Sequence, residues 1–128
     1  MPSENLQKDT VIPIDTPSLR NALGSFATGV TVITALGIEG QKVGMTANSF
    51  SSVSLDPALV LWNIGRDSNC FDDFIVAKAF AVHILTSDQQ ELSNRFSKTG
   101  SDRFDGLDCT EGVMGIPLLP HSSACFQC

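Results

Sequence analysis

Positive charge is scarce in this chain. Only 8 Lys and Arg occur among 128 residues, against 14 Asp and Glu, and the formal net charge is −6. Nucleic acids and anionic membrane surfaces are bound through clustered Lys and Arg, so this balance argues against both as partners. A phosphate group bound by this protein would have to find its positive charge at one local spot.

The sequence also lacks the hydrophobic segments that carry a chain into or across a membrane. Residues 1–10 have neither the basic start nor the apolar run of a secretory signal, and no stretch is apolar over the length of a membrane span. We therefore expect a cytoplasmic protein with no membrane partner. The 4 cysteines are then expected as reduced thiols rather than as a disulfide framework.

Cysteine and histidine are too few and too scattered to predict a metal site. Cys125 and Cys128 form one Cys-x-x-Cys pair, which alone could be half of a zinc site or a redox dithiol. Cys109, His83 and His121 are the other candidate ligands, and their spacing does not suggest coordination, so we expect no metal. His83 lies within an apolar run, where a structural role with one bonded ring nitrogen is the more common one.

Length and composition indicate one folded domain, with a hydrophobic content of 42%. Residues 1–15 show no helical periodicity and are expected to form a flexible leader, so that the domain spans residues 16–128. Thr16 followed by Pro17 predicts a helix start, with the threonine hydroxyl as N-cap. The apolar residues that follow predict one buried helix face: Leu19, Leu23 and Phe26.

Strand patterns dominate the rest of the chain and predict an α+β fold that is mainly β. Runs of β-branched or apolar residues predict strands over residues 30–36, 41–46, 58–64 and 80–85, with another beginning at residue 124. The run at 58–64 is almost continuously apolar, so we expect both of its faces to be buried.

Two short helices complete the predicted elements. Phe71, Phe74 and Ile75 describe an amphipathic helix, and a second helix is expected from Ser87 to residue 96, opened by Ser87 and Gln90 as a capping box. Beyond it, residues 97–123 show no regular pattern and predict a long loop.

Residues 44–57 are distinctive because half of them are Gly, Ala, Ser or Thr. Small residues let backbone N–H groups approach a ligand closely, while the hydroxyl groups and the Asn48 amide can both donate and accept hydrogen bonds. These groups suit a ligand with a phosphate and a heteroaromatic ring. The alternative is a polar turn whose hydroxyl groups make only local hydrogen bonds.

Arg95, Lys98 and Arg103 concentrate positive charge at the end of the last predicted helix and just beyond it. If the fold brings them to residues 44–57, cations, hydroxyl groups and backbone donors would converge on a phosphate. The alternative is a solvated helix end whose cations face the helix dipole, worth a few tenths to about 1 kcal/mol. The sequence leaves both possibilities open.

Several blocks of sequence occur in the order of a known family. They are Phe-Ala-Thr-Gly-Val-Thr-Val-Ile-Thr at 26–34, Gly-Met-Thr-Ala-Asn-Ser-Phe at 44–50, Ser-Val-Ser-Leu-Asp-Pro at 52–57, Phe-Ala-Val-His-Ile-Leu at 80–85, Asp-Gln at 88–89 and Asp-Arg-Phe at 102–104. Through them, residues 18–128 resemble the short-chain flavin reductases, the reductase components of two-component flavin monooxygenases.

The resemblance implies a fold, an activity and partners. The fold would be an FMN-binding split β-barrel with short flanking helices, usually dimeric. The activity would be reduction of FMN or FAD by NADH or NADPH, with the reduced flavin supplied to a partner oxygenase. Because the flavin carries the redox chemistry and fixed N–H donors stabilise its reduced anion, we name no catalytic side chain.

The resemblance also implies where the flavin is bound. Residues 46–49 would meet the pyrimidine side of the ring, and Ser52 and Ser54 would lie toward the ribityl phosphate. Further contacts would come from the segment after the third strand, from the end of the last helix and from the loop beyond. The predicted cofactor-binding residues are Thr46, Ala47, Asn48, Ser49, Ser52, Ser54, Asn63, Ser68, Asn69, Cys70, Phe96, Ser97, Lys98 and Arg103.

The chain departs from the family pattern at its end. Members of the family continue beyond the point that matches Cys128, through further strands and a Gly-Asp-His segment linked to nicotinamide binding. We therefore expect a C-terminally shortened barrel whose open edge is covered by a partner subunit, the tail or the long loop. Two alternatives stay open: a flavin-binding protein without nicotinamide-driven turnover, and a non-catalytic remnant that dimerises.

Overall fold

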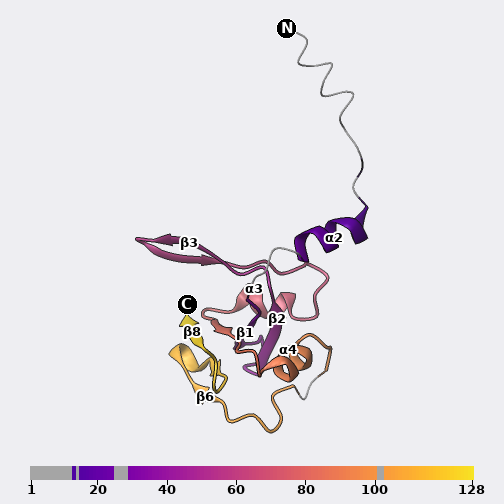
Figure 1. Ribbon diagram of the computed structural model, residues 1–128. Helices are drawn as coiled ribbons and strands as arrows, with labels where there is room; N and C mark the ends of the chain where they lie inside the picture. Colours follow the sequence, from indigo (N-terminus) through magenta and orange to yellow (C-terminus); the bar gives the residue numbers. More distant parts are fainter. Residues whose placement is uncertain (1–12, 14, 25–28, 101–102) are drawn as a thin grey trace.

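A four-stranded antiparallel sheet forms the centre of the protein (Figure 1). The computed structural model describes residues 13, 15–24, 29–100 and 103–128. The sheet has the order β2–β1–β5–β8. Its strands are β1 (Thr31–Leu36), β2 (Lys42–Ala47), β5 (Ala81–Ile84) and β8 (Ala124–Gln127). All four were expected from the sequence, and their positions confirm a mainly β protein.

Two smaller ribbons and the helices surround this sheet. One ribbon pairs β3 (Ser51–Leu55) with β4 (Ala58–Leu61), and the other pairs β6 (Thr110–Glu111) with β7 (Pro117–Leu118). The helices are α2 (Thr16–Gly24), α3 (Phe71–Val76), α4 (Gln90–Phe96) and the 3₁₀ turn η1 (Val113–Gly115). Residues 97–123, predicted as one long loop, therefore contain two short strands and a turn.

Strand β1 lies inside the sheet with a neighbouring strand along each edge, and its side chains are buried on both faces. It pairs antiparallel with β2, where Ile33 lies opposite Met45, and with β5, where Ile33 lies opposite Val82. Successive side chains of a strand point to opposite faces. Ile33 accordingly packs in one core cluster and Val32 in another, and both are fully buried.

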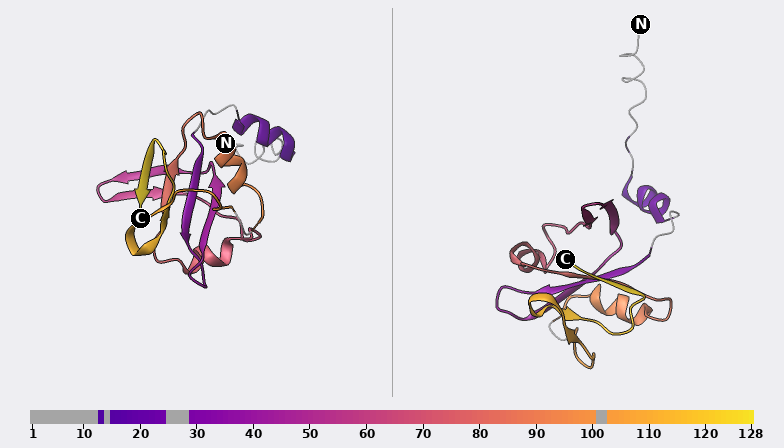
Figure 2. Two further views of the ribbon diagram at one scale, coloured as in Figure 1. Left: turned by 90° about the horizontal axis from the view of Figure 1, so that it is seen from below. Right: turned by 90° about the vertical axis from the view of Figure 1, so that its left-hand side faces the viewer.

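Helices α3 and α4 cover the two faces of the sheet (Figure 2). On one face Phe74 of α3 joins Ile33 and Val82, and its ring meets the indole of Trp62 edge to face at 5.1 Å. On the other face Leu92 and Phe96 of α4 pack against Val32, which confirms the buried face predicted for that helix. Each half of the core therefore depends on one short helix.

The first part of the run at 58–64, predicted to be buried on both faces, is instead the exposed strand β4, whereas Trp62 and Ile64 at its end are partly buried against the core. Leu59 and Leu61 are 49% and 51% exposed, and β4 pairs only with β3, in a ribbon that extends away from the central sheet (Figure 1). We call residues 51–61 the β3–β4 arm. The prediction was wrong because an apolar run indicates a buried strand but does not show which surface, if any within the chain, covers it.

Helix α2 forms as predicted but differs in its packing and its cap. Leu19 and Leu23 are 44% and 64% exposed, so the predicted buried face is not buried, and Phe26 lies outside the described residues. Asp15, not Thr16, caps the helix: its carboxylate accepts the Ser18 N–H at 2.6 Å, which lowers the pKa of that carboxyl group.

Two further differences concern α3 and α4. Ile75, predicted on the buried face of α3, is 63% exposed. Helix α4 has no side-chain cap; the Gln89 amide oxygen instead accepts the Thr86 N–H at 2.9 Å and closes the turn before the helix. The Ser87–Gln90 capping box is therefore absent. The predicted leader lies almost entirely outside the described residues, and none of the helices in the described ranges has the length and apolar character to cross a membrane.

Gly44 provides a test of the packing between β2 and α4. A Cβ atom at Gly44 would lie 2.8 Å from Phe96 Cε1 and 3.2 Å from Phe104 Cζ, and these two rings already pack edge to face at 4.9 Å. We expect Gly44→Ala to lower the free energy of unfolding by about 1–3 kcal/mol because the added methyl group would force the buried Phe96 ring to shift. Urea unfolding followed by circular dichroism measures the change.

Gly29→Ala is the matched control, since a Cβ atom at Gly29 meets nothing within 4 Å. This variant should keep the stability of the parent protein. Equal stability of the two variants would contradict the packing described for Gly44.

Candidate functional site

The end of β2 brings together the first group of predicted flavin-binding residues. The Thr46 hydroxyl donates to the Ser93 carbonyl of α4 at 2.6 Å, and the Ala47 carbonyl accepts the Thr31 hydroxyl at 2.5 Å. Asn48 follows immediately and is exposed. Thr46 and Ala47 thus have fixed structural hydrogen bonds, and the Asn48 side chain that follows them is exposed.

Ser49 joins this segment to the end of β4. Its Oγ accepts the Asn63 N–H at 3.0 Å and lies 3.4 Å from the Asn63 carbonyl oxygen. The exposed side chains of Asn48 and Asn63 therefore come from neighbouring segments. Within the described residues, neither of these two side-chain amides has a hydrogen-bonding partner in the protein. Both remain available to donate to and accept from a ligand.

A second group of predicted residues meets at the start of α3. Cys70 is buried, with its Sγ 3.8 Å from the Gly44 carbonyl oxygen and 3.5 Å from Arg103 Nη2. Asn69, Cys70 and Arg103 share the lining of an open cavity of about 640 Å³ beside β2. Ser68, whose Oγ accepts the Cys70 N–H at 3.3 Å, stabilises the turn that precedes the helix.

The remaining predicted hydroxyl groups lie on the β3–β4 arm. Ser52 is exposed and Ser54 half-buried, and both belong to β3, which projects from the sheet on a different side from α4 (Figure 1). The contacts within the chain do not bring them to Lys98 or Arg103. The predicted phosphate site formed by these hydroxyl groups and the cations is therefore not assembled within one described chain.

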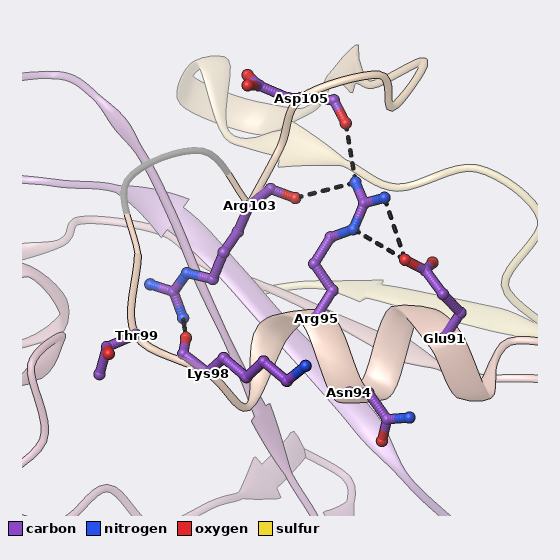
Figure 3. Close-up of a pocket in the computed structure, with 7 residues that line it drawn as sticks. All are labelled: Glu91, Asn94, Arg95, Lys98, Thr99, Arg103 and Asp105. Carbon is purple, nitrogen blue, oxygen red and sulfur yellow. Dashed lines mark hydrogen bonds and ion pairs between the residues drawn. The ribbon is translucent and has the colours of Figure 1, made fainter.

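The three cations line an open pocket of about 520 Å³ at the end of α4 (Figure 3). Two of them, Arg95 and Arg103, already donate hydrogen bonds to other groups of the protein. Arg95 binds Glu91 through Nε and Nη2 at 3.2 and 3.1 Å, and its Nη1 donates to the carbonyl oxygens of Arg103 and Asp105 at 3.4 and 2.8 Å. Arg103 donates to the carbonyl oxygens of Phe96 and Lys98 at 3.3 and 2.9 Å.

Lys98 differs from the two arginines. It is exposed, and in the part of the chain that the structure describes its ammonium group has no hydrogen-bonding partner. Phe96, by contrast, is a core residue at 1% exposure, and the Ser97 hydroxyl donates to the Asn94 carbonyl at 2.8 Å. Of the residues predicted at this helix end, Lys98 is the one whose side chain is free to meet an anion.

Glu91 is a residue of this pocket that the sequence analysis missed. It forms the described i,i+4 ion pair with Arg95, with a nitrogen–oxygen distance of 3.1 Å. A Glu four residues before an Arg on a predicted helix is a recognisable signal for such a pair. With Glu91 and Asp105 among its lining residues, the pocket carries negative charge beside the positive charge that was expected.

His83 lies outside these pockets and has the structural role that was expected. Its side chain is fully buried; Nε2 accepts the Leu119 N–H at 3.0 Å, so Nδ1 carries the proton and donates to the Val32 carbonyl at 3.0 Å. Burial lowers the pKa of this imidazole below its ordinary value of 6.5, against a smaller opposing effect of the Val32 hydrogen bond.

Cys109, Cys125 and Cys128 are not activated as nucleophiles. Burial raises the pKa of Cys109, and it also raises the pKa of Cys125 and Cys128, the first of them further raised by the neighbouring Cys128 thiol. All three are therefore neutral thiols near pH 7, the form that is neither nucleophilic nor a metal ligand. Among the described residues, no group of three or more His, Cys, Asp and Glu is placed to hold a metal ion.

Comparisons with known proteins identify the family of the chain. Residues 23–128 match the flavin reductase like domain. The protein FMN reductase (NADH) SmoA from Agrobacterium fabrum is 50% identical over 111 residues, which cover 87% of this chain and 63% of that protein. The reductase component of a flavin-dependent trigonelline monooxygenase from Acinetobacter baylyi is 46% identical over 110 residues, covering 86% of this chain and 36% of that protein.

A solved structure extends the agreement to the fold. The NADH:FAD oxidoreductase of Streptomyces globisporus, in complex with NAD and FAD fragments, matches with a TM-score of 0.83 and 39% sequence identity, over 92% of this chain and 71% of that chain. The chain therefore belongs to the flavin reductase family, which confirms the resemblance and the fold class. It spans less than two thirds of the length of the two curated relatives described above.

The buried histidine predicts a pH dependence of stability. Because the folded-state pKa of His83 lies below 6.5, the unfolded chain takes up this proton first as the pH falls. Stability is then complete above about pH 6.5 and decreases below that value as the pH falls toward the folded-state pKa. We expect the free energy of unfolding, measured with urea, to fall as the pH is lowered below about 6.5.

His83→Gln separates this effect from other titrating groups. The Gln side chain cannot be protonated, so the variant should be less stable than the parent protein at neutral pH but should show a weaker dependence on pH. The same slope in parent and variant would contradict the contribution assigned to His83.

Proposed function

We propose that this chain is a flavin-binding domain of an NADH-dependent flavin reductase, formed by residues 16–128 and working in the cytoplasm. The activity would be transfer of hydride from the nicotinamide to FMN or FAD. The family membership and the relatives named above as NADH-dependent reductases of FMN and FAD support this function. Reduced flavin would pass to a partner oxygenase, as the trigonelline monooxygenase component named above suggests.

The observation that carries the proposal is the junction made by Ser49. Its hydrogen bond to the Asn63 N–H brings the end of β2 and the end of β4 together, with two exposed amides at the junction. Amide groups match the alternating donors and acceptors of a flavin pyrimidine edge. We infer that Asn48 and Asn63 bind and orient that edge, while the Thr46 hydrogen bond to Ser93 holds the strand end in place.

The other predicted residues would act on the rest of the ligand. Asn69 lies beside Cys70 and Arg103 in the neighbouring cavity, and its side chain is exposed. Lys98 supplies a free ammonium group for a phosphate. When bound, the flavin supplies the redox chemistry. The chain's own residues would bind it, orient its ring and hold backbone donors near the polar edge, with no side chain needed as acid or base.

We further propose that the protein forms a homodimer through the β3–β4 arm. The arm exposes Val53, Leu55, Leu59 and Leu61 at 57%, 94%, 49% and 51%. A projecting ribbon with so many exposed apolar side chains is typical of an interaction surface. A second copy of the chain would also cover Ser52 and Ser54, and could bring these hydroxyl groups to a flavin held by the other copy.

Flavin binding can be measured through the single tryptophan, Trp62, which is the residue before Asn63. We expect FMN to change Trp62 fluorescence and raise the melting temperature. Asn48→Ala should weaken FMN binding by about threefold to tenfold, the effect of one lost hydrogen bond. In the parent protein with FMN bound, anaerobic addition of NADH should bleach the absorbance of the oxidised flavin.

Asn21→Ala on the exposed helix α2 is the matched control and should bind FMN like the parent protein. Binding of FMN without bleaching by NADH would indicate a flavin-binding protein without turnover. If FMN changes neither the fluorescence nor the melting temperature of the folded protein, the proposed function is wrong.

The arm makes a separate prediction about assembly. Leu59→Asp should convert a dimer to a monomer, because it places a charge within the proposed apolar contact. Sedimentation equilibrium measures the molecular mass in solution. Ile38→Asp, the same kind of change at a 63% exposed site in the β1–β2 turn, should leave the dimer intact. A monomeric parent protein, or a dimer that survives Leu59→Asp, would contradict the role of the arm.

A further inference from the structure

Arg103 connects two segments that were both predicted to contact the flavin. Its Nη1 donates to the carbonyl oxygens of Phe96 and Lys98, at 3.3 and 2.9 Å, and so grips the end of α4. Its Nη2 lies 3.5 Å from Cys70 Sγ, at the start of α3. One guanidinium group therefore joins α4, on one face of the sheet, to the turn that precedes α3, on the other.

The backbone of Arg103 is itself held by a second guanidinium group. Arg95 donates to the carbonyl oxygens of Arg103 and Asp105, and its orientation is set by the ion pair with Glu91 (Figure 3). Arg103 is thus fixed at its main chain by α4 and returns its own side chain to the end of the same helix. This arrangement keeps the position of the guanidinium group fixed before any ligand binds.

The same contacts argue against Arg103 as a phosphate ligand. A phosphate is best held by the paired N–H groups of a guanidinium fork. Both N–H groups of Arg103 Nη1 and one N–H group of Nη2 already have protein partners, so a phosphate could not use the Nη1–Nη2 fork without displacing them. Lys98 stands beside it with no such partner within the described ranges, and is the better candidate for the anion.

We propose that Arg103 is a positioning residue, which holds the Ser68–Cys70 turn and the end of α4 at a fixed separation and does not itself bind the flavin phosphate. The inference rests on the proposed function, because the two segments are candidate flavin contacts. If the proposal is right, loss of the bridge would weaken the contacts to the flavin ring as much as the contacts to the ribityl phosphate.

The comparison of FMN with riboflavin tests this role, since riboflavin lacks the phosphate. Arg103→Lys keeps the positive charge but cannot reach three acceptors with one ammonium group. We expect the variant to bind both ligands about tenfold more weakly, as for one lost charge-assisted hydrogen bond, with an unchanged ratio of the two affinities. Arg20→Lys, the same change on exposed α2, should alter neither affinity.

Hydrogen exchange provides a readout that needs no flavin. In Arg103→Lys, the amides of residues 68–74 and 96–100 should exchange faster than in the parent protein, whereas those of α2 should not change. If the parent protein binds neither flavin, the proposed function fails, and the exchange data still decide whether Arg103 bridges the two segments. Unchanged exchange in both segments would overturn the bridge.

The affinities decide the other part of the proposal. A loss confined to FMN would make Arg103 a phosphate ligand and overturn the inference, as would parent-like affinity for both flavins. If Arg103→Lys does not fold, Cys70→Ala removes the sulfur end of the bridge, together with the contact of that sulfur with the Gly44 carbonyl oxygen. This second variant should weaken both flavins equally and speed exchange at residues 68–74; parent-like values for both measurements would overturn the inference.

Discussion

The structure depends on the double pairing of β1. With β2 on one side and β5 on the other, its backbone groups are satisfied within the sheet and its side chains are divided between two core clusters. Val32 and Ile33 are fully buried on opposite faces, and burial of such side chains contributes about 1.5–3 kcal/mol each. A shift of one residue in register would exchange the two sets and leave neither helix with its partners.

The positions of the candidate binding segments follow from this arrangement. The Thr46 hydroxyl reaches Ser93 because α4 is packed against the face of β1 and β2, and Cys70 reaches Gly44 because α3 is packed on the other side. The polar contacts at the candidate site therefore depend on the same packing of α3 and α4 against the sheet that forms the apolar core. The fully bonded His83 belongs to the same framework, since it joins β1 and the segment after β7 from its place in β5.

Elements with local patterns could be predicted from the sequence, whereas those that depend on partners far away in the chain could not. The β-branched residues of β1 specify a strand, and the Leu92–Phe96 spacing of α4 specifies a helix and its buried side; the strand, the helix and the burial of Leu92 and Phe96 were confirmed. The β3–β4 arm was not predictable, because Leu59 and Leu61 show the same apolar pattern that a buried strand would show. The cap predicted for α2 was wrong because the Asp15 carboxylate competes for the Ser18 N–H. The sequence also could not show that nearby carbonyl oxygens accept hydrogen bonds from Arg95 and Arg103. Choosing between such partners requires distances that only the fold supplies.

The contrast between the arginines and Lys98 shows how one local charge cluster can combine support with recognition. A guanidinium group can satisfy several carbonyl oxygens at once, and the segment around residues 103–105 presents such oxygens to Arg95. An ammonium group on a flexible stem gains less from such a position and remains hydrated and accessible. Since each carbonyl contact of the arginines also removes a competing donor from the pocket, Lys98 becomes the cation that an incoming anion would meet first. Because the chain has only 8 Lys and Arg residues, few other cations can take the place of Lys98.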